Sequence, residues 1–194
     1  MKINLPASVF AFIILAVSCT KEATSKRTES TLSTNTGKAL SFSIGDHYGG
    51  GIIFYIDTSG VHGLIADTVD LQDAKWLNSA NDLNLTTHAK PTAVGKGFMN
   101  TRKIVAAQGD SGKYVARECI RLKRNGFNDW FLPSKDELNL LYLNKAVVGG
   151  FSTGDYWSSS ENTKSTAFLQ SLANGTQSYG TKAFSLHVRA IRAF

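Results

Sequence analysis

The sequence predicts an α+β domain, with antiparallel strands at both ends and helices between them. Glycines flank two short apolar runs, residues 52–56 and 63–66, which are joined by a "DTSG" turn as in a β-hairpin. The middle of the chain repeats apolar residues every three or four positions, the period of an amphipathic helix. The last third changes to alternating runs separated by Asn174 and Gly175, which is typical of an antiparallel meander.

The first 18 residues have the features of a secretory signal: a basic start, a short apolar run and small residues before Cys19. The run is shorter than the roughly 20 residues that span a bilayer. "LAVSC" resembles the lipobox of bacterial lipoproteins, although Ala16 stands where the commonest pattern has Leu. We therefore expect a signal peptide over residues 1–18 and lipid attachment at Cys19, with an ordinary cleaved signal peptide or a buried strand as alternatives. Thr20 after the cysteine favours the outer membrane, on its periplasmic or cell-surface face.

Residues 19–41 are rich in Ser, Thr and Lys and contain few large apolar residues, so they are expected to form a flexible tether. The tether leads to a single domain over residues 42–194. The whole chain has a net charge of +6, but residues 42–194 carry 16 Lys and Arg against 13 Asp and Glu. This weak excess argues against a nucleic-acid partner and is compatible with an acidic surface partner such as an anionic polysaccharide.

Two helices are expected between the hairpin and the centre of the chain. The first lies in "NTRKIVAAQG" with Asn100 as its N-cap, and the second covers residues 111–124 before an "NG" stop. Arg117 and Arg121 lie on the polar face of the second helix, which would face either an anionic ligand or solvent. Cys119 lies on its apolar face and is expected to be buried, with a nucleophilic role as a remote alternative.

The stretch "NGFNDWFLPSKDELNLLY" combines a short strand, "DWFL", with a helix that begins after Pro133. Ser134 and Glu137 have the spacing of a capping box, in which each side chain binds the other residue's backbone N–H group. Asp136 and Glu137 are adjacent and point in different directions around the helix, which makes them a poor acid/base pair. No catalytic residue is predicted, and we expect that the protein is not an enzyme.

Trp76 and Trp157 are the candidate binding residues, because an indole face stacks on the C–H surface of a sugar. Trp76 lies in the polar connection over residues 67–97, and Trp157 follows the turn before "YWSSSE". Burial in the core is the alternative for each. Trp130 lies inside the apolar "DWFL" run and is expected to be core.

Metal binding is not predicted. Asp67, Asp70 and Asp73 could offer oxygen ligands to calcium, but their spacing matches no known loop, and solvent-exposed aspartates are the favoured interpretation. The four histidines are scattered along the chain without the spacing of a zinc site. No cofactor is expected.

Several motifs resemble a bacterial domain family of unknown function. The family is typified by the C-terminal domain of the Legionella collagen-like adhesin (Lcl C-terminal domain). The motifs are "GGIIFYID", "GLIA", "NTRKIVAAQG", "NGFNDWFLPSKDELNLLY", "YWSSSE" and "VRAIRAF". The resemblance implies a C-type-lectin-like fold, with a twisted antiparallel sheet, two or three helices and long ordered loops. The sequence lacks the "EPN" and "WND" motifs of calcium-dependent sugar-binding lectins, so their calcium chemistry is not carried over.

These features lead to one favoured function and two alternatives. We expect a cell-envelope lipoprotein whose lectin-like module binds carbohydrate or another extracellular polymer, through Trp76, Trp157, Arg117 and Arg121. The alternative is a structural or assembly lipoprotein that binds another envelope protein. A glycan-active envelope enzyme is less favoured. The expected partners are a membrane, reached through the N-terminal lipid, and a polysaccharide or envelope protein, with no nucleic acid.

Overall fold

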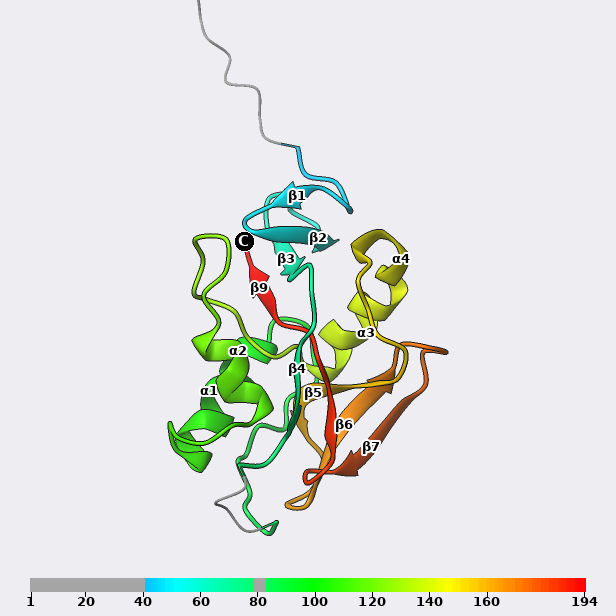
Figure 1. The fold of residues 1–194 in the computed structure, drawn as a ribbon. Coiled ribbons are helices and arrows are strands. Elements are labelled where there is room, and N and C mark those ends of the chain that lie inside the picture. Colours follow the sequence, from blue (N-terminus) through cyan, green and yellow to red (C-terminus); the bar gives the residue numbers. More distant parts are fainter. Residues whose placement is uncertain (1–40, 79–82) are drawn as a thin grey trace, which may run out of the picture. The chain divides into compact units, whose positions relative to one another are not determined.

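Strands from both ends of the domain form two sheets in the computed structural model, which describes residues 41–78 and 83–194 (Figure 1). The first sheet is antiparallel and has the order β1-β2-β3-β9. Its strands are β1 (His47–Tyr48), β2 (Gly51–Ile56), β3 (Gly63–Ala66) and β9 (Ile191–Ala193). The predicted hairpin of β2 and β3 is confirmed. The predictions for the signal peptide, for Cys19 and for nearly all of the tether fall outside the described residues.

The second sheet has the order β4-β8-β5-β6-β7. Its strands are β4 (Leu71–Lys75), β5 (Asp155–Glu161), β6 (Thr166–Ser171), β7 (Gln177–Thr181) and β8 (Ser185–Val188). All neighbours are antiparallel except β5 and β8, which are parallel where Tyr156 pairs with His187. The predicted turn at Asn174 and Gly175 does join two antiparallel strands, β6 and β7.

Within the described residues, four helices connect the strands, so the predicted α+β class is confirmed. They are α1 (Gly97–Gln108), α2 (Val115–Arg121), α3 (Lys135–Leu143) and the single turn α4 (Lys145–Val148). Helices α1 and α2 pack against the second sheet, and α3 contacts β2, β5 and β6. No helix within residues 41–78 and 83–194 has the length and apolar content needed to cross a membrane.

The core consists of two apolar clusters. One joins α1 and α2 to the second sheet and contains Ile104, Cys119 and Trp157. The other joins α3 to the first sheet and contains Phe54 and Leu141. Cys119 is fully buried as predicted, and burial raises the pKa of its thiol far above the ordinary value. A thiol in this protonated, inaccessible state cannot act as a nucleophile.

Two helix boundaries differ from the sequence prediction. Helix α1 begins at Gly97, with Lys96 in the N-cap position. Asn100 is not the cap: it lies buried within the helix, where its Nδ2 donates to the Pro91 carbonyl at 2.7 Å. Helix α2 covers Val115–Arg121 and is shorter than expected, because the chain is already extended at Leu122.

The capping box of α3 is confirmed. Glu137 N–H donates to Ser134 Oγ at 3.3 Å, and Glu137 Oε2 accepts from Ser134 N–H at 2.7 Å. Glu137 is buried, and its Oε1 also accepts from Gly95 N–H at 2.7 Å. The preceding "DWFL" run is not a full strand, because only Phe131 forms a β-bridge, with Ile191 of β9.

The C-terminal "VRAIRAF" segment is divided between the two sheets. Val188 ends β8 in the second sheet and Ile191 begins β9 in the first. The Arg189 side chain is buried at this crossing, where its Nε donates to Asp70 Oδ1 at 2.8 Å and its Nη1 donates to the Asp67 carbonyl at 2.9 Å. Arg189 therefore fixes the point at which the chain changes sheets.

Candidate functional site

Trp76 and Trp157 are both completely buried, so the expectation that they form exposed stacking platforms is wrong. Trp76 Nε1 donates to the Ser158 carbonyl at 2.9 Å, and Trp157 Nε1 donates to the Phe184 carbonyl at 3.3 Å. Both rings belong to the cluster between α1, α2 and the second sheet. The polar residues around both tryptophans suggested exposure, but side chains from segments that are distant in the sequence cover the two rings. Trp130 is core, as predicted.

The basic face of α2 is mostly occupied by local contacts. Arg117 Nε donates to Asp110 Oδ1 at 3.1 Å, its Nη1 donates to the Gly112 carbonyl at 2.8 Å, and only 17% of its side chain is exposed. Arg121 lies 3.8 Å from the same Asp110 oxygen and is 58% exposed. Arg117 therefore holds the loop before α2, and of these two predicted binding residues only Arg121 is open to a ligand.

The three aspartates considered as metal ligands each face a cationic or imidazole side chain. Asp67 binds Arg124, Asp70 binds Arg189, and Asp73 accepts from His187 Nδ1 at 2.8 Å. Asp67 is fully buried, so the expectation of solvent-exposed aspartates is also corrected for this residue. Across the described ranges no three His, Cys, Asp or Glu side chains are grouped as metal ligands.

An open groove lies on one face of the strands β5, β6 and β7. Directly paired residues of antiparallel strands point to the same face, and residues two apart in a strand share it. The pairs Asp155 with Ser171 and Leu169 with Ser178 therefore project from one face, which is also the face of Trp157. Helices α1 and α2 cover this face around Trp157, and the groove is the part that they leave open.

The groove has a volume of about 410 Å³ and combines an apolar floor with a polar rim. Phe184, which is 55% exposed, lies with Leu169 and Leu186 among the apolar residues. The rim consists of Asp155, Ser171, Asn174, Thr176 and Ser178. A side chain at Gly180 would place its Cβ 3.0 Å from Leu169 Cδ2 and 3.5 Å from Phe184 Cδ2, so the glycine leaves the space between them open.

Most polar groups on the rim are available to a ligand. Within the described residues, the hydroxyls of Ser171, Thr176 and Ser178 and the carboxylate of Asp155 have no hydrogen-bond partner. Asn174 Oδ1 accepts from Thr176 N–H at 3.0 Å, which holds the turn between β6 and β7. The groove therefore presents unused donors and acceptors beside an exposed aromatic ring.

Tyr179 is a residue of β7 whose side chain points to the face opposite the groove, and it is 60% exposed. It pairs with Phe168, whose ring lies 5.5 Å from Lys135 Nζ. Tyr179 borders the groove together with its neighbours Ser178 and Gly180. Because Ser178 projects from the groove face, strand alternation turns the Tyr179 side chain to the opposite face, so Tyr179 borders the groove through its backbone. Tyr179 is thus an exposed aromatic residue of the same hairpin that does not present its ring to the groove.

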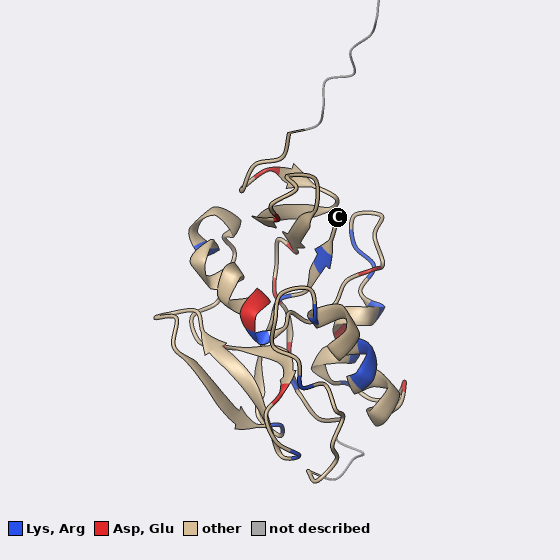
Figure 2. Ribbon diagram, turned by 180° about the vertical axis from the view of Figure 1, so that it is seen from behind, with Lys and Arg blue, Asp and Glu red and all other residues tan. Residues whose placement is uncertain are grey.

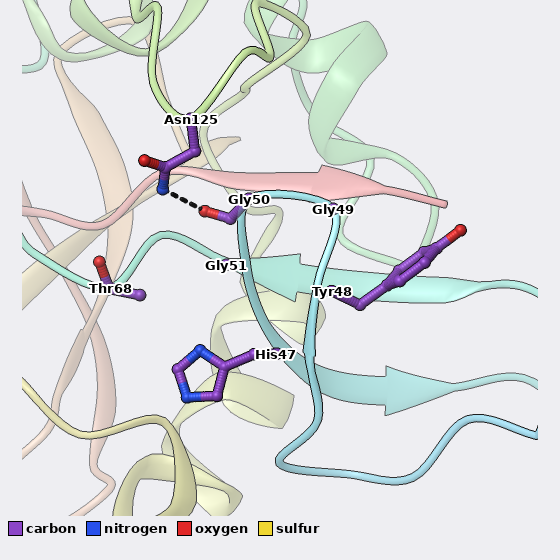
Figure 3. Close-up of a pocket in the computed structure, with 7 residues that line it drawn as sticks. All are labelled: His47, Tyr48, Gly49, Gly50, Gly51, Thr68 and Asn125. Atoms are coloured by element: carbon purple, nitrogen blue, oxygen red, sulfur yellow. Dashed lines mark hydrogen bonds between the residues drawn. The ribbon is translucent and has the colours of Figure 1, made fainter.

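A second hollow, of about 270 Å³, surrounds the turn between β1 and β2 (Figure 3). The Asn125 side chain reaches across it and its Nδ2 donates to the Gly50 carbonyl at 2.7 Å. A Cβ on Gly50 would lie 2.7 Å from Phe127 Cδ2. The hollow is therefore a packing junction between the "GGG" turn and the "NGF" loop, and much of its wall is glycine backbone.

Sequence reasoning missed the groove because its residues come from four strands and two turns. A signal was present in "SLANGTQSYGTKAF", which is rich in hydroxyl and amide side chains and carries two aromatic residues. Strand alternation would have placed Ser178 and Tyr179 on opposite faces. It would not have shown which face is open, since that depends on where α1, α2 and α3 pack.

The comparison with family models agrees with the motifs found in the sequence. A model of the family described as the Lcl C-terminal domain matches residues 69–192, a range that contains the four helices, the second sheet and the groove. No curated protein matches. A solved fimbrial protein from Bacteroides ovatus has 14% sequence identity to the chain and a TM-score of 0.48. That alignment covers 73% of this chain and 43% of the fimbrial protein.

Proposed function

This chain belongs to the Lcl C-terminal domain family, and from that premise we propose that it is a cell-envelope lipoprotein whose adhesin-type domain binds carbohydrate. The binding site is the groove on β5, β6 and β7 together with Phe184. The main support is the exposed Phe184 ring beside unpartnered hydroxyl and carboxylate groups. We further propose a C-type-lectin-like relationship for the fold, as the sequence motifs imply.

The chemistry of the groove suits a saccharide. An aromatic face packs against the C–H groups of a sugar ring, while hydroxyl and carboxylate side chains exchange hydrogen bonds with the sugar hydroxyls. The groove volume of about 410 Å³ lies within the range of small-ligand sites. Serine and threonine hydroxyls can donate and accept, which matches the dual character of sugar hydroxyls.

The charge of the groove favours a neutral sugar. Asp155 is the only charged residue among those that line it, and a carboxylate would repel a sulfated or uronic saccharide at this position. The mild positive charge of residues 42–194 is carried elsewhere on the domain. The groove therefore suits a neutral or amino sugar better than an anionic polysaccharide.

Attachment to a membrane completes the proposed role. Lipid on Cys19 would hold the chain at the outer membrane, and residues 19–41 would act as the tether that lets the domain reach a polymer. The support is the "LAVSC" motif after an apolar run and the Ser- and Thr-rich segment that follows it. Acyl chains contribute about 0.8 kcal/mol per buried methylene, so more than one chain is needed for stable anchoring.

The deciding experiment measures saccharide binding by the domain over residues 41–194, first on a glycan array and then as isotherms with the best ligand. Phe184→Ala should weaken binding by about tenfold, because the lost stacking surface is worth on the order of 1.4 kcal/mol. Tyr179→Ala removes an equally exposed aromatic ring from the opposite face and should bind like the wild type. Absence of binding by the wild type, or equal losses in the two variants, would refute the assignment.

One observation favours the alternative of a protein partner. Ile44, Leu143 and Val147 are 41%, 65% and 51% exposed, and a Cβ on Gly45 would lie 2.7 Å from Val147 Cγ1. Gly45, the residue after Ile44, thus lies against Val147, and clusters of exposed apolar residues mark protein contacts. Leu143→Ser with Val147→Ser should then abolish crosslinking to an envelope protein in cells while leaving saccharide binding intact.

A further inference from the structure

The outward face of α1 and the loop before it form a surface that is both basic and apolar. Its cations are Lys90, Lys96, Arg102 and Lys103, and its apolar residues are Val94, Phe98 and Met99. Residues 83–109 contain these four cations and no Asp or Glu. In Figure 2, where Lys and Arg are blue, blue segments lie on the side of the molecule formed by α1 and α2. We call the seven residues the α1 surface.

Helical geometry gathers the exposed residues of α1 on one side. Phe98, Met99, Arg102 and Lys103 are exposed, while Gly97, Asn100, Thr101, Ile104 and Gln108 are buried. With 3.6 residues per turn, positions 98, 99, 102 and 103 share one half of the helix. The apolar side chains of Phe98 and Met99 therefore lie on the same side of α1 as the cations Arg102 and Lys103, and one partner can contact all four.

The cations of the α1 surface are not neutralised by acidic side chains. In the part of the chain that the structure describes, none of the four forms an ion pair. Arg102 lies 5.7 Å from the Phe98 ring centre, and Lys103 Nζ donates to the His88 carbonyl at 3.3 Å. Glu137 approaches from α3, but its buried carboxylate accepts from Gly95 N–H and is turned inward.

The apolar residues decide what kind of anionic partner fits. Phe98 is 41% exposed, Met99 54% and Val94 37%, although they are neighbours on one short stretch of chain. A soluble polyanion would use the cations alone and would leave these side chains in water. A membrane of anionic lipids uses both, because its headgroups attract Lys and Arg while aromatic and aliphatic residues enter the headgroup boundary.

We propose that the α1 surface docks the domain on an anionic lipid surface, with Phe98 and Met99 inserted between headgroups. The proposal concerns a contact made by the folded domain and does not depend on saccharide binding. Helix α1 and the β6–β7 hairpin lie on opposite sides of the domain in both views (Figures 1 and 2). The proposed saccharide groove lies on β5, β6 and β7, beyond the part of the sheet that α1 and α2 cover, so docking through the outward face of α1 does not occupy it.

The test uses an indole as a local probe. All three native tryptophans are completely buried, so the indole of Phe98→Trp is the one that lipid can reach. The full-length chain is reconstituted in phosphatidylcholine vesicles, with or without about 30% phosphatidylglycerol, a charge density at which each Lys or Arg adds roughly fivefold to binding. Acrylamide and brominated acyl chains then report exposure to water and contact with lipid. Met99→Trp repeats the measurement one residue along, in case Phe98→Trp disturbs packing against Phe131.

The expected result is specific to anionic vesicles. There, acrylamide quenching of the indole introduced by Phe98→Trp should fall and brominated lipid should quench it, and Arg102→Glu with Lys103→Glu should reverse both effects. Phe184→Trp on the groove side serves as the control and should stay accessible to acrylamide in all vesicles. The N-terminal segment is identical in every variant, so its own membrane affinity cancels from the comparison.

Other results would overturn the proposal. Equal shielding in both vesicle types would exclude recognition of anionic lipid, and unchanged accessibility would exclude docking. Shielding without quenching by brominated lipid would identify a second copy of the chain as the occupant. Shielding by soluble dextran sulfate, again without lipid quenching, would identify a polyanion site.

Discussion

Lys182 Nζ lies 2.6 Å from Glu161 Oε1, and neither side chain is exposed to solvent. Glu161 also accepts from the N–H groups of Thr87 at 2.8 Å and His88 at 3.0 Å. Lys182 donates to two further carbonyls and lies 4.5 Å from the Trp76 ring centre. This pair joins the β7–β8 connection, β5 and the segment before α1, so it connects segments that are far apart in the sequence.

Removal of the lysine should be strongly destabilising. Lys182→Met leaves a buried carboxylate without its counterion, which costs about 3–5 kcal/mol in comparable proteins. Adding Glu161→Gln should recover at least about 1 kcal/mol, because the neutral amide oxygen can still accept from the backbone without leaving a charge buried. Equilibrium urea unfolding of the two variants and the wild type measures both values. A double variant less stable than Lys182→Met alone would contradict this account.

The same pair predicts how stability depends on pH. Burial opposes the charge on Glu161, but the hydrogen bonds from Lys182 and Thr87 outweigh it and hold the pKa of this carboxyl below its ordinary value of 4.5. The folded state then binds the Glu161 proton less readily than the unfolded chain does. Its contribution is fully present above about pH 4.5 and is lost as the pH falls through the folded pKa.

The difference in unfolding free energy between the wild type and Glu161→Gln should therefore shrink as the pH is lowered from about 7 to about 3, through the range in which the carboxyl takes up its proton. Urea unfolding at several pH values would show this convergence. A difference that stayed constant over the whole range would mean that Glu161 does not titrate with folding.

Gly50 and Gly60 provide a matched pair for the turn at the second hollow. Both have positive φ, 87° and 74°, so alanine has a similar conformational cost of about 1–2 kcal/mol at each. A Cβ at Gly60 would meet nothing within 4 Å, whereas one at Gly50 would lie 2.7 Å from Phe127. Gly50→Ala should lose a further 1–3 kcal/mol or so through overpacking. The difference in Tm between the two variants measures the effect of the clash with Phe127. Equal shifts in Tm would show that the residues around Gly50 rearrange to accommodate the added Cβ.

Features set by neighbouring residues were predictable from the sequence. The Ser134–Glu137 capping box spans three residues and the β2–β3 hairpin depends on a local turn, so both could be recognised before the structure. Features set by distant segments were not. Trp76 binds Ser158, 82 residues away, and no local pattern reports that contact.

The prediction that Trp157 is an exposed binding residue was wrong for a specific reason. All residues of β5 after Asp155 are buried, because β5 lies inside its sheet with α1 against one face and α3 against the other. Its polar "SSSE" run is typical of a solvated strand, yet Ser158 and Ser160 are buried and their Oγ atoms donate to the carbonyls of Phe168 and Pro91. Polar composition therefore indicated exposure at Trp157, although the serines are buried and have hydrogen-bond partners within the fold.

Membrane retention tests the lipid anchor. Cys19→Ser should release the protein from the membrane fraction and remove label from a radioactive fatty acid, because the thiol is the proposed attachment point. Cys119→Ser is the control, since this buried thiol is out of reach of an acyltransferase. Wild-type protein that carries no lipid label would refute the anchor whatever its fractionation.

The last prediction concerns the acidic rim of the groove. Asp155→Asn keeps an acceptor oxygen and should reduce affinity for a neutral saccharide by only a few fold, whereas Asp155→Ala removes it and should cost about tenfold, as for a lost hydrogen bond to a charged group. Arg121→Ala should leave affinity unchanged at low and at high salt, because Arg121 lies on α2, outside the residues that line the groove. Isotherms at two ionic strengths separate these contributions, since screening weakens exposed charge pairs but not stacking on Phe184. If Arg121→Ala instead removed a strong salt dependence, the saccharide would be anionic and would bind the basic face of α2, as the sequence first suggested, and not the groove.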